Sequence, residues 1–181
     1  MWISPGTKTD AYELDELYWF IERKGKRETR ENIYIMTMIS RNPRQIVEFA
    51  VDKSITTNVL QGIADSAPAA GKYYTDGCLT YCDVIFSGKH IRNVHDKKDT
   101  HNIESVNADL RHYLSGFARR SRCFYRNPET LTAVLAVFID AYNKYGEAKL
   151  RYRKPVKHKS PNPSKHLHEF RDPPFCILDF L

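Results

Sequence analysis

Three acidic residues of this chain stand on three separate predicted elements: Asp15, Asp76 and Glu104. Asp15 lies in a run rich in β-forming residues, Asp76 follows a short predicted strand, and Glu104 falls in the first turn of a predicted helix. Hard divalent cations such as Mg²⁺ take oxygen ligands, which clustered carboxylates supply. Two such ions can activate an attacking oxygen and stabilise a leaving oxygen at a phosphodiester. The chemistry expected of these acids, if the fold brings them together, is metal-dependent phosphoryl transfer.

The elements that must position these acids are predicted from hydrophobic patterning. Three runs rich in β-forming and apolar residues, joined by short polar segments, indicate antiparallel strands: residues 12–22, 33–39 and 45–51. A helix over residues 54–65, with Ser54 as its N-cap, is followed by a short strand over residues 72–76. Because the strand runs are almost continuously apolar, we expect helices to cover the sheet on both faces.

The helix that carries Glu104 is predicted from apolar residues that recur at helical spacing between His101 and Arg120. A last helix is expected to begin at Pro128, which suits a first turn, and to stop at Gly146. This order of elements favours an α/β fold with a mixed five-stranded sheet flanked by helices, the ribonuclease H-like arrangement. In that arrangement an acid of the first strand, an acid after the fourth strand and an acid on a late helix converge.

The basic excess of the chain lies in a C-terminal stretch. The 181 residues include 28 Lys and Arg against 22 Asp and Glu, a net charge of +6. Residues 151–168 contain six Lys and Arg and no acid, so they account for the whole excess. Such a patch most often meets the phosphates of nucleic acid or of membrane lipid. The alternative is a solvated tail that binds nothing in particular.

The composition excludes several classes of protein and distinguishes a globular region from a basic, proline-rich C-terminal region. Hydrophobic residues make up 41% and aromatic residues 12% of the chain, which excludes wholesale disorder. The longest apolar run, residues 133–139, is too short to cross a membrane, and no secretory signal is visible. We therefore expect a soluble, cytoplasmic protein with a catalytic domain over residues 1–147 and a basic, proline-rich arm over residues 148–181. The apolar end of the arm, residues 175–181, is expected to dock on this body or on a partner.

The four cysteines are expected to be reduced thiols, because no export signal is visible. Cys78 and Cys82, with His90 and His95, read C-x3-C-x7-H-x4-H. The seven-residue middle spacing is short for a zinc finger, so scattered cysteines and surface histidines are the favoured interpretation.

Three blocks of the chain together resemble the transposases of insertion sequence 1, within the DDE transposase and retroviral-integrase-like group. The blocks are residues 13–17 (ELDEL) with Trp19 and Phe20, residues 75–77 (TDG) with Tyr81, and residues 101–104 (HNIE) with Asn107, Leu110 and Arg111. They occur in order, each on the expected element, and the similarity continues to near Tyr145.

This resemblance implies a function and a set of site residues. Asp15, Asp76 and Glu104 would be the catalytic residues and would hold two Mg²⁺ ions, for which Mn²⁺ can substitute. The enzyme would cleave DNA strands at the ends of an insertion sequence and join them to a target duplex. DNA contacts are expected from residues of the third block and from basic residues beyond it: His101, Asn107, Arg111, Arg119, Arg120, Arg122, Arg126, Lys154, Lys157 and Lys159. The resemblance also implies a homo-oligomer on DNA, associated with the nucleoid, and no membrane partner.

Two departures from the family pattern leave alternatives open. Family members usually carry an upstream portion that reads the element ends, and only fourteen residues precede Asp15 here. That reader is therefore expected on another product of the same element. Ser105 stands where an arginine is more usual, which affects one expected DNA contact. The alternatives are a truncated remnant that binds DNA without cutting it and a ribonuclease H-like nuclease that cleaves without strand transfer.

Overall fold

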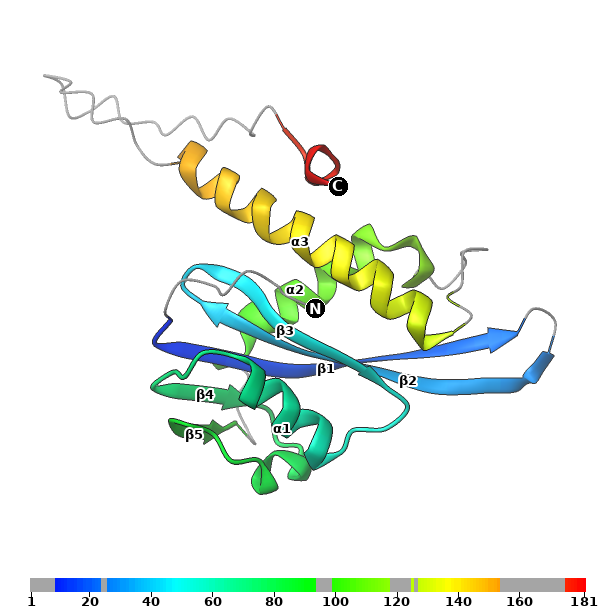
Figure 1. Ribbon diagram of the computed structural model, residues 1–181, viewed down its shortest axis with the longest axis horizontal. Coiled ribbons are helices and arrows are strands. Elements are labelled where there is room, and N and C mark those ends of the chain that lie inside the picture. Colours follow the sequence, from blue (N-terminus) through cyan, green and yellow to red (C-terminus); the bar gives the residue numbers. More distant parts are fainter. Residues whose placement is uncertain (1–8, 24–25, 94–98, 118–124, 126, 154–174) are drawn as a thin grey trace, which may run out of the picture.

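The computed structural model describes residues 9–23, 26–93, 99–117, 125, 127–153 and 175–181. Five strands form one sheet in the order β3-β2-β1-β4-β5 (Figure 1). The strands are β1 (Ala11–Arg23), β2 (Lys26–Arg41), β3 (Arg44–Asp52), β4 (Lys72–Thr75) and β5 (Lys89–Arg92). The first three pair antiparallel, whereas β1 with β4 and β4 with β5 pair parallel. The predicted α/β class and mixed five-stranded sheet are confirmed, and the topology is compatible with a ribonuclease H-like arrangement.

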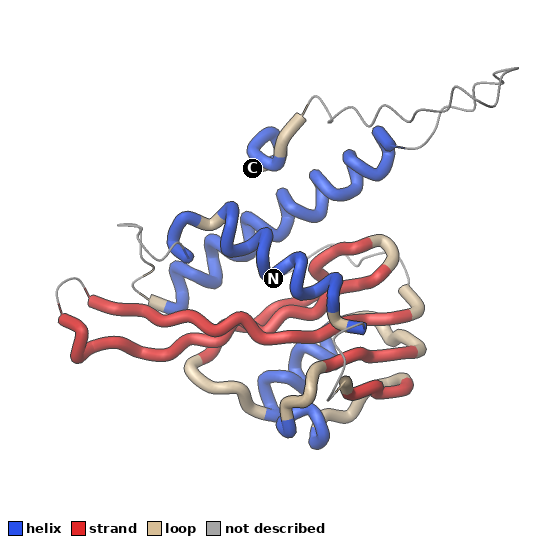
Figure 2. The backbone as a smooth tube through the Cα atoms, turned by 180° about the vertical axis from the view of Figure 1, so that it is seen from behind, coloured by secondary structure: helices blue, strands red, loops and turns tan. Residues whose placement is uncertain are grey.

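Three α-helices flank this sheet: α1 (Thr57–Ser66), α2 (His101–Tyr113) and α3 (Pro128–Arg153). Helix α1 lies on one face of the sheet, and α2 and α3 lie on the other, as the view from behind makes clear (Figure 2). Among the described residues, no helix is both long enough and apolar enough to cross a membrane.

The two faces of the sheet bury two separate hydrophobic cores because successive strand residues point to opposite sides. On β1, Leu17 and Trp19 pack with α2 and α3, whereas Tyr12 and Leu14 pack with α1. The predicted covering of both faces is therefore confirmed. Only the first residues of β1 are bordered by strands on both sides, because β4 is much shorter than β2 and pairs with β1 only from Ala11 to Glu13.

Helix α1 begins two residues later than expected. Its N-cap is Thr56, whose Oγ1 accepts the backbone N–H of Val59 at 3.3 Å. Ser54, the predicted N-cap, lies in the preceding turn, where its N–H donates to the Asp52 carboxylate at 3.1 Å. The prediction of Ser54 as the N-cap was wrong. Two residues of capping type, Ser54 and Thr56, stand close together, and Ser54 belongs to the preceding turn.

Helix α2 ends at Tyr113, and a 3-10 helix, η3 (Ser115–Phe117), follows it. The change of direction brings the Phe117 ring edge-on to Trp19 of β1, with ring centroids 5.3 Å apart. The prediction of one continuous helix to Arg120 is therefore wrong after Tyr113. Arg120 itself lies outside the described residues.

Helix α3 begins at Pro128, as predicted, but it continues through Gly146 to Arg153. Contacts with β3 hold the helix on both sides of this glycine. Asn143 exchanges hydrogen bonds with the backbone N–H and C=O of Ile46 at 2.9 and 2.8 Å, and Gln45 donates to Glu147 at 2.6 Å. These contacts offset the cost of about 1 kcal/mol that glycine carries inside a helix. The predicted stop at Gly146 is wrong.

Residues 148–153, which we expected to begin the arm, are the last turns of α3. Residues 154–174 of the arm lie outside the described residues. The apolar C-terminal end docks on this body through part of its side chains. Its short 3-10 helix η5 (Ile177–Phe180) places Ile177 in the main core, and Phe175 and Phe180 lie against the ring of Tyr145.

Candidate functional site

The candidate site lies where the parallel strands β1 and β4 separate. Their pairing runs from Ala11 opposite Lys72 to Glu13 opposite Tyr74 and then stops. Continuing the same register by two residues takes Asp15 opposite Asp76. Ligands of open α/β sheets bind beyond the carboxyl ends of such strands, where the crevice between strands lies.

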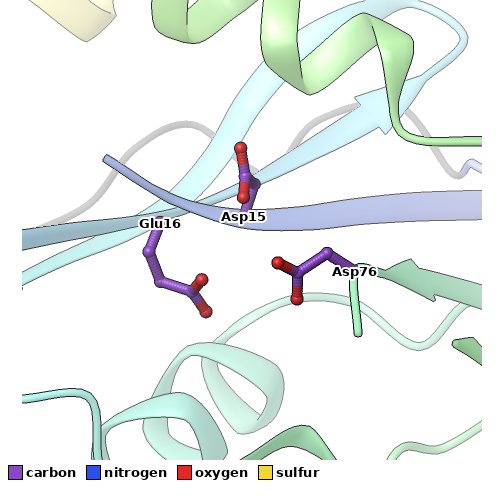
Figure 3. Close-up of side chains that lie close together, drawn as sticks. All are labelled: Asp15, Glu16 and Asp76. Atoms are coloured by element: carbon purple, nitrogen blue, oxygen red, sulfur yellow. The ribbon is translucent and has the colours of Figure 1, made fainter. Parts of the chain in front are cut away.

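Three carboxylates meet at this point. One oxygen each of Asp15, Glu16 and Asp76 lies within 4.8 Å of the others. Figure 3 shows Asp15 and Glu16 extending to opposite sides of β1, with Asp76 reaching toward them from the end of β4. All three groups offer oxygen donors, the type that Mg²⁺ and Mn²⁺ prefer in proteins.

Local hydrogen bonds hold the two aspartates. The Asp76 Oδ1 atom accepts the backbone N–H of Cys78 at 2.9 Å, and this turn leads from β4 into the 3-10 helix η1 (Leu79–Asp83). On the other side, the Asn107 Nδ2 atom of α2 donates to Asp15 Oδ2 at 2.8 Å. The site is therefore built from β1, the end of β4 and the middle of α2.

Glu13 fixes α2 against β1, and the sequence analysis assigned it no role of its own. Its side chain is 0% exposed, and its Oε1 accepts from Arg41 Nε and from Asn102 Nδ2, both at 2.7 Å. The Oε2 atom accepts the backbone N–H of Ile103 at 2.9 Å, in the first turn of α2. Thr100, the N-cap residue, makes no such bond with its side chain. The only signal in the sequence is that Glu13 stands two residues before Asp15, on the same face of the strand.

Burial raises the pKa values of Asp15 and Glu16, the two acids that β1 contributes to this group. The pKa of Asp15 rises to about 6, because burial and the nearby charges of Asp76 and Glu104 outweigh the hydrogen bonds from the backbone and Asn107. The pKa of Glu16 rises to about 7, mainly by burial, with the charges of Asp76 and Asp15 adding to it. Ionising all three groups together is therefore unfavourable without a positive counter-charge.

The residues present fit a divalent cation. Within the described ranges, none of the ion pairs found involves Asp15, Glu16 or Asp76. The Glu16 Oε1 atom is buried and has no hydrogen-bond partner there. A half-buried group of acids with no lysine, arginine or histidine paired to it has the donor set and the charge that a bound cation would balance.

The structure brings two of the three predicted catalytic residues together. Asp15 and Asp76 belong to the group of three, and its third member is Glu16 rather than Glu104. Glu104 lies on an exposed part of α2, one turn before Asn107, and its negative charge is close enough to raise the pKa of Asp15. In the sequence, Glu16 stood out only as a member of the acidic block of residues 13–17.

The predicted DNA-contacting residues fall into different surroundings. His101 and Arg111 are exposed on α2. Asn107 is only 3% exposed and bonds Asp15, so the structure gives it a partner within the protein instead of a surface position. The remaining predicted contacts lie outside the described residues: Arg119, Arg120, Arg122, Arg126, Lys154, Lys157 and Lys159.

The cysteine and histidine pattern is not assembled as a metal site in the part that the structure describes. Cys78 and Cys82 are free thiols, and the His90 ring bonds the Thr75 hydroxyl at 2.9 Å. Arg92 donates to the sulfur of Cys82. His95 lies outside the described residues.

No model of a known protein family matches the chain, and no curated protein matches it either.

Proposed function

We propose that this chain is the catalytic subunit of a DDE transposase, which cleaves and joins DNA strands by metal-dependent phosphoryl transfer. The observation that carries the proposal is the position of Asp15 and Asp76. They lie where the pairing of the parallel strands β1 and β4 stops, and with Glu16 they form a group of three carboxylates. None of the ion pairs found in the described part of the chain involves them. Their order and spacing with Glu104 resemble the acidic blocks of the insertion sequence 1 family.

In this proposal Asp15, Asp76 and Glu104 hold Mg²⁺, or Mn²⁺ in its place. When bound, two such ions supply activation of the attacking oxygen and stabilisation of the leaving oxygen. The protein keeps the acids in position: Asn107 orients Asp15, and the turn at Cys78 orients Asp76.

The proposed reaction has two steps at one site. Water first attacks a phosphodiester at the element end, and the broken P–O bond leaves a free 3′-hydroxyl. That hydroxyl then attacks a phosphodiester of the target duplex, so one P–O bond forms as another breaks. The exposed Arg111 and His101 lie on the same helix as Glu104 and would meet the DNA backbone there.

The partners in this proposal are the element ends, the target duplex and further copies of the chain on DNA. Six Lys and Arg residues of 151–168 add sequence-independent phosphate contacts. Recognition of the element ends comes from a separate DNA-reading domain or product of the same element.

The test is an assay with labelled DNA that carries the element ends, Mg²⁺, and separate detection of cut and joined products. Asp15→Asn, Asp76→Asn and Glu104→Gln should each abolish both products. Asp140→Asn is the matched control, because Asp140 is an exposed acid of α3 that pairs with Lys144 one turn away. It should cut and join like the parent protein.

The outcomes separate the proposal from its alternatives. An Asp76→Asn protein that cuts at the parental rate would refute the assignment of the metal ligands. Cleavage without joined products would instead indicate a ribonuclease H-like nuclease. A parent protein that binds the DNA but yields neither product would indicate a binding remnant. Circular dichroism of each variant confirms that loss of activity is not loss of fold.

A further inference from the structure

Three buried polar atoms around the acidic group have no hydrogen-bond partner in the described part of the structure: Glu16 Oε1, Tyr81 Oη and Asn107 Oδ1. They are half of the six such atoms found among the described residues, so missing hydrogen-bond partners are concentrated around the acidic group. Tyr81 is 0% exposed, and Asn107 is almost as deeply buried. Leaving a buried polar group unpaired costs about 1–3 kcal/mol, so the concentration of such groups points to a missing partner.

Tyr81 comes to the site through the turn that Asp76 makes. The 3-10 helix η1 follows that turn and buries the Tyr81 ring in the core beneath α1. Its hydroxyl faces the acids: burial, and then the charges of Glu16, Asp15 and Asp76, raise the pKa of Tyr81 well above its usual value. The hydroxyl also offsets part of the rise in the pKa of Glu16, although the two groups are not placed at full hydrogen-bonding geometry.

Glu16 therefore approaches the gap between β1 and β4 from the face that carries α1. Asp15 points to the opposite face, where Asn107 of α2 meets it. Glu104 belongs to that second face as well, because it lies on α2. The acids of the site thus come from both sides of the sheet, and Glu16 comes from the side of Tyr81.

We propose that Glu16 is a further cation ligand of this site and that the Tyr81 hydroxyl is the group that positions it. The inference rests on the cation site proposed above, because Glu16 would share its ion with Asp15 and Asp76. A cation there accounts for a half-buried carboxylate that has no cationic partner among the described residues. Rotation of the Tyr81 hydroxyl toward one Glu16 oxygen would leave the other oxygen directed at the ion. The nearby Asn107 Oδ1 offers a neutral oxygen beside it.

The first experiment measures Mn²⁺ binding to the full chain by isothermal titration calorimetry. Glu16→Gln should weaken binding at least about tenfold. Glu16→Asp should weaken it by a similar factor, because it keeps the charge but withdraws the carboxylate by one methylene. Glu48→Gln is the control, since Glu48 is a half-buried acid of β3 that bonds the backbone N–H of Phe49. Its affinity should equal that of the parent protein.

The second experiment tests the positioning role with Tyr81→Phe. Loss of an outer partner of a ligand typically weakens metal binding roughly 10–100-fold. In the presence of a chelator the variant should unfold at the same or a higher urea concentration, because it removes an unpaired buried hydroxyl. If the hydroxyl had a merely structural role, its removal in Tyr81→Phe would lower the stability of the protein and leave the Mn²⁺ affinity unchanged. Tyr142→Phe is the control, since that hydroxyl bonds Asp109 on the other face at 2.7 Å.

The result that overturns the inference is parental Mn²⁺ affinity in Glu16→Gln, or in Glu16→Asp, while Asp15→Asn and Asp76→Asn lose binding. Parental affinity in Glu16→Gln would show that Glu16 has no role in binding. Parental affinity in Glu16→Asp would show that Glu16 contributes only its negative charge and does not contact the ion. Either would leave the proposed function standing. If the parent protein does not bind Mn²⁺, or if the aspartate variants bind it unchanged, the proposed cation site itself fails. Parental affinity in Tyr81→Phe would remove the positioning role.

Discussion

The Glu13 carboxylate of β1 accepts the backbone N–H of Ile103 in the first turn of α2 at 2.9 Å. A strand side chain thus does what an N-cap side chain usually does, and its negative charge complements the positive end of the helix. Because α2 also carries Asn107 and Glu104, this one contact sets the position of the helix relative to Asp15. The same carboxylate binds Arg41, whose guanidinium lies 3.7 Å over the ring centre of Tyr74.

Removal of the Glu13 carboxylate should destabilise the protein strongly. Glu13→Ala leaves Arg41 and the Ile103 N–H without their buried partner, so we expect the free energy of unfolding to fall by about 3 kcal/mol. Asp140→Ala, which breaks an exposed pair with Lys144, should cost no more than about 0.5 kcal/mol. Urea denaturation of both variants checks the prediction. Equal, small losses would show that the Glu13 contacts do not anchor α2.

The stability of the metal-free protein should fall as the pH rises from about 4 to about 7. Asp15 and Glu16 have pKa values of about 6 and about 7 when folded, above their ordinary values of 3.8 and 4.5. The folded state therefore binds more protons than the unfolded state in this window, and raising the pH favours unfolding. At about 1.4 kcal/mol for each pKa unit, the two groups should together contribute a fall of several kcal/mol.

Urea denaturation across this pH range, with a chelator present, measures that fall. The double variant Asp15→Asn, Glu16→Gln should lack it, because neither group then titrates. Mg²⁺ should restore stability to the parent protein at the upper end of the range, since cation binding favours the ionised folded form. A parent and a double variant with parallel pH profiles would contradict the prediction.

The docking of the C-terminal end on α3 should contribute measurably to stability. Ile177 is buried in the main core, whereas Leu178 beside it is 68% exposed. Ile177→Ala should lower the free energy of unfolding by about 2–4 kcal/mol, and Leu178→Ala should change it by less than about 0.5 kcal/mol. Thermal and urea unfolding of the two variants test this. Similar effects of both substitutions would mean that the end does not pack as described.

The basic arm should govern the salt dependence of DNA binding. Because residues 175–181 pack on α3, the arm is better tested by neutralising charges than by deletion. Six substitutions to Gln do this: Arg151, Arg153, Lys154, Lys157, Lys159 and Lys165. If all six meet phosphates, the slope of log affinity against log salt concentration should flatten by about 5. Binding to unrelated duplexes should weaken equally, and an unchanged slope would identify a solvated tail.

Much of the fold could be predicted from local sequence alone. The apolar runs of β1, β2 and β3 read as strands because alternation and β-forming residues act within a few residues of one another. Pro128 marked the start of α3 for a similar local reason. The incorrect predictions of helix ends occur where contacts between distant segments determine the structure. Gly146 remains helical because β3 holds α3 on both sides of it, and no local rule contains that contact.

For the candidate site, the sequence by itself determined that Asp15 lies within one strand and that Asp76 ends another, because the patterning locates those strands. An acid seldom lies on an apolar strand face without a reason. Only the tertiary structure decided which other residues join them. The early end of the β1–β4 pairing opens the gap that Glu16 enters, and the turn at Asp76 carries Tyr81 beneath it. Glu13 and Asn107 acquire their partners only when α2 packs on β1, some ninety residues away along the chain. Such roles depend on contacts between distant segments, which residue type and spacing do not encode.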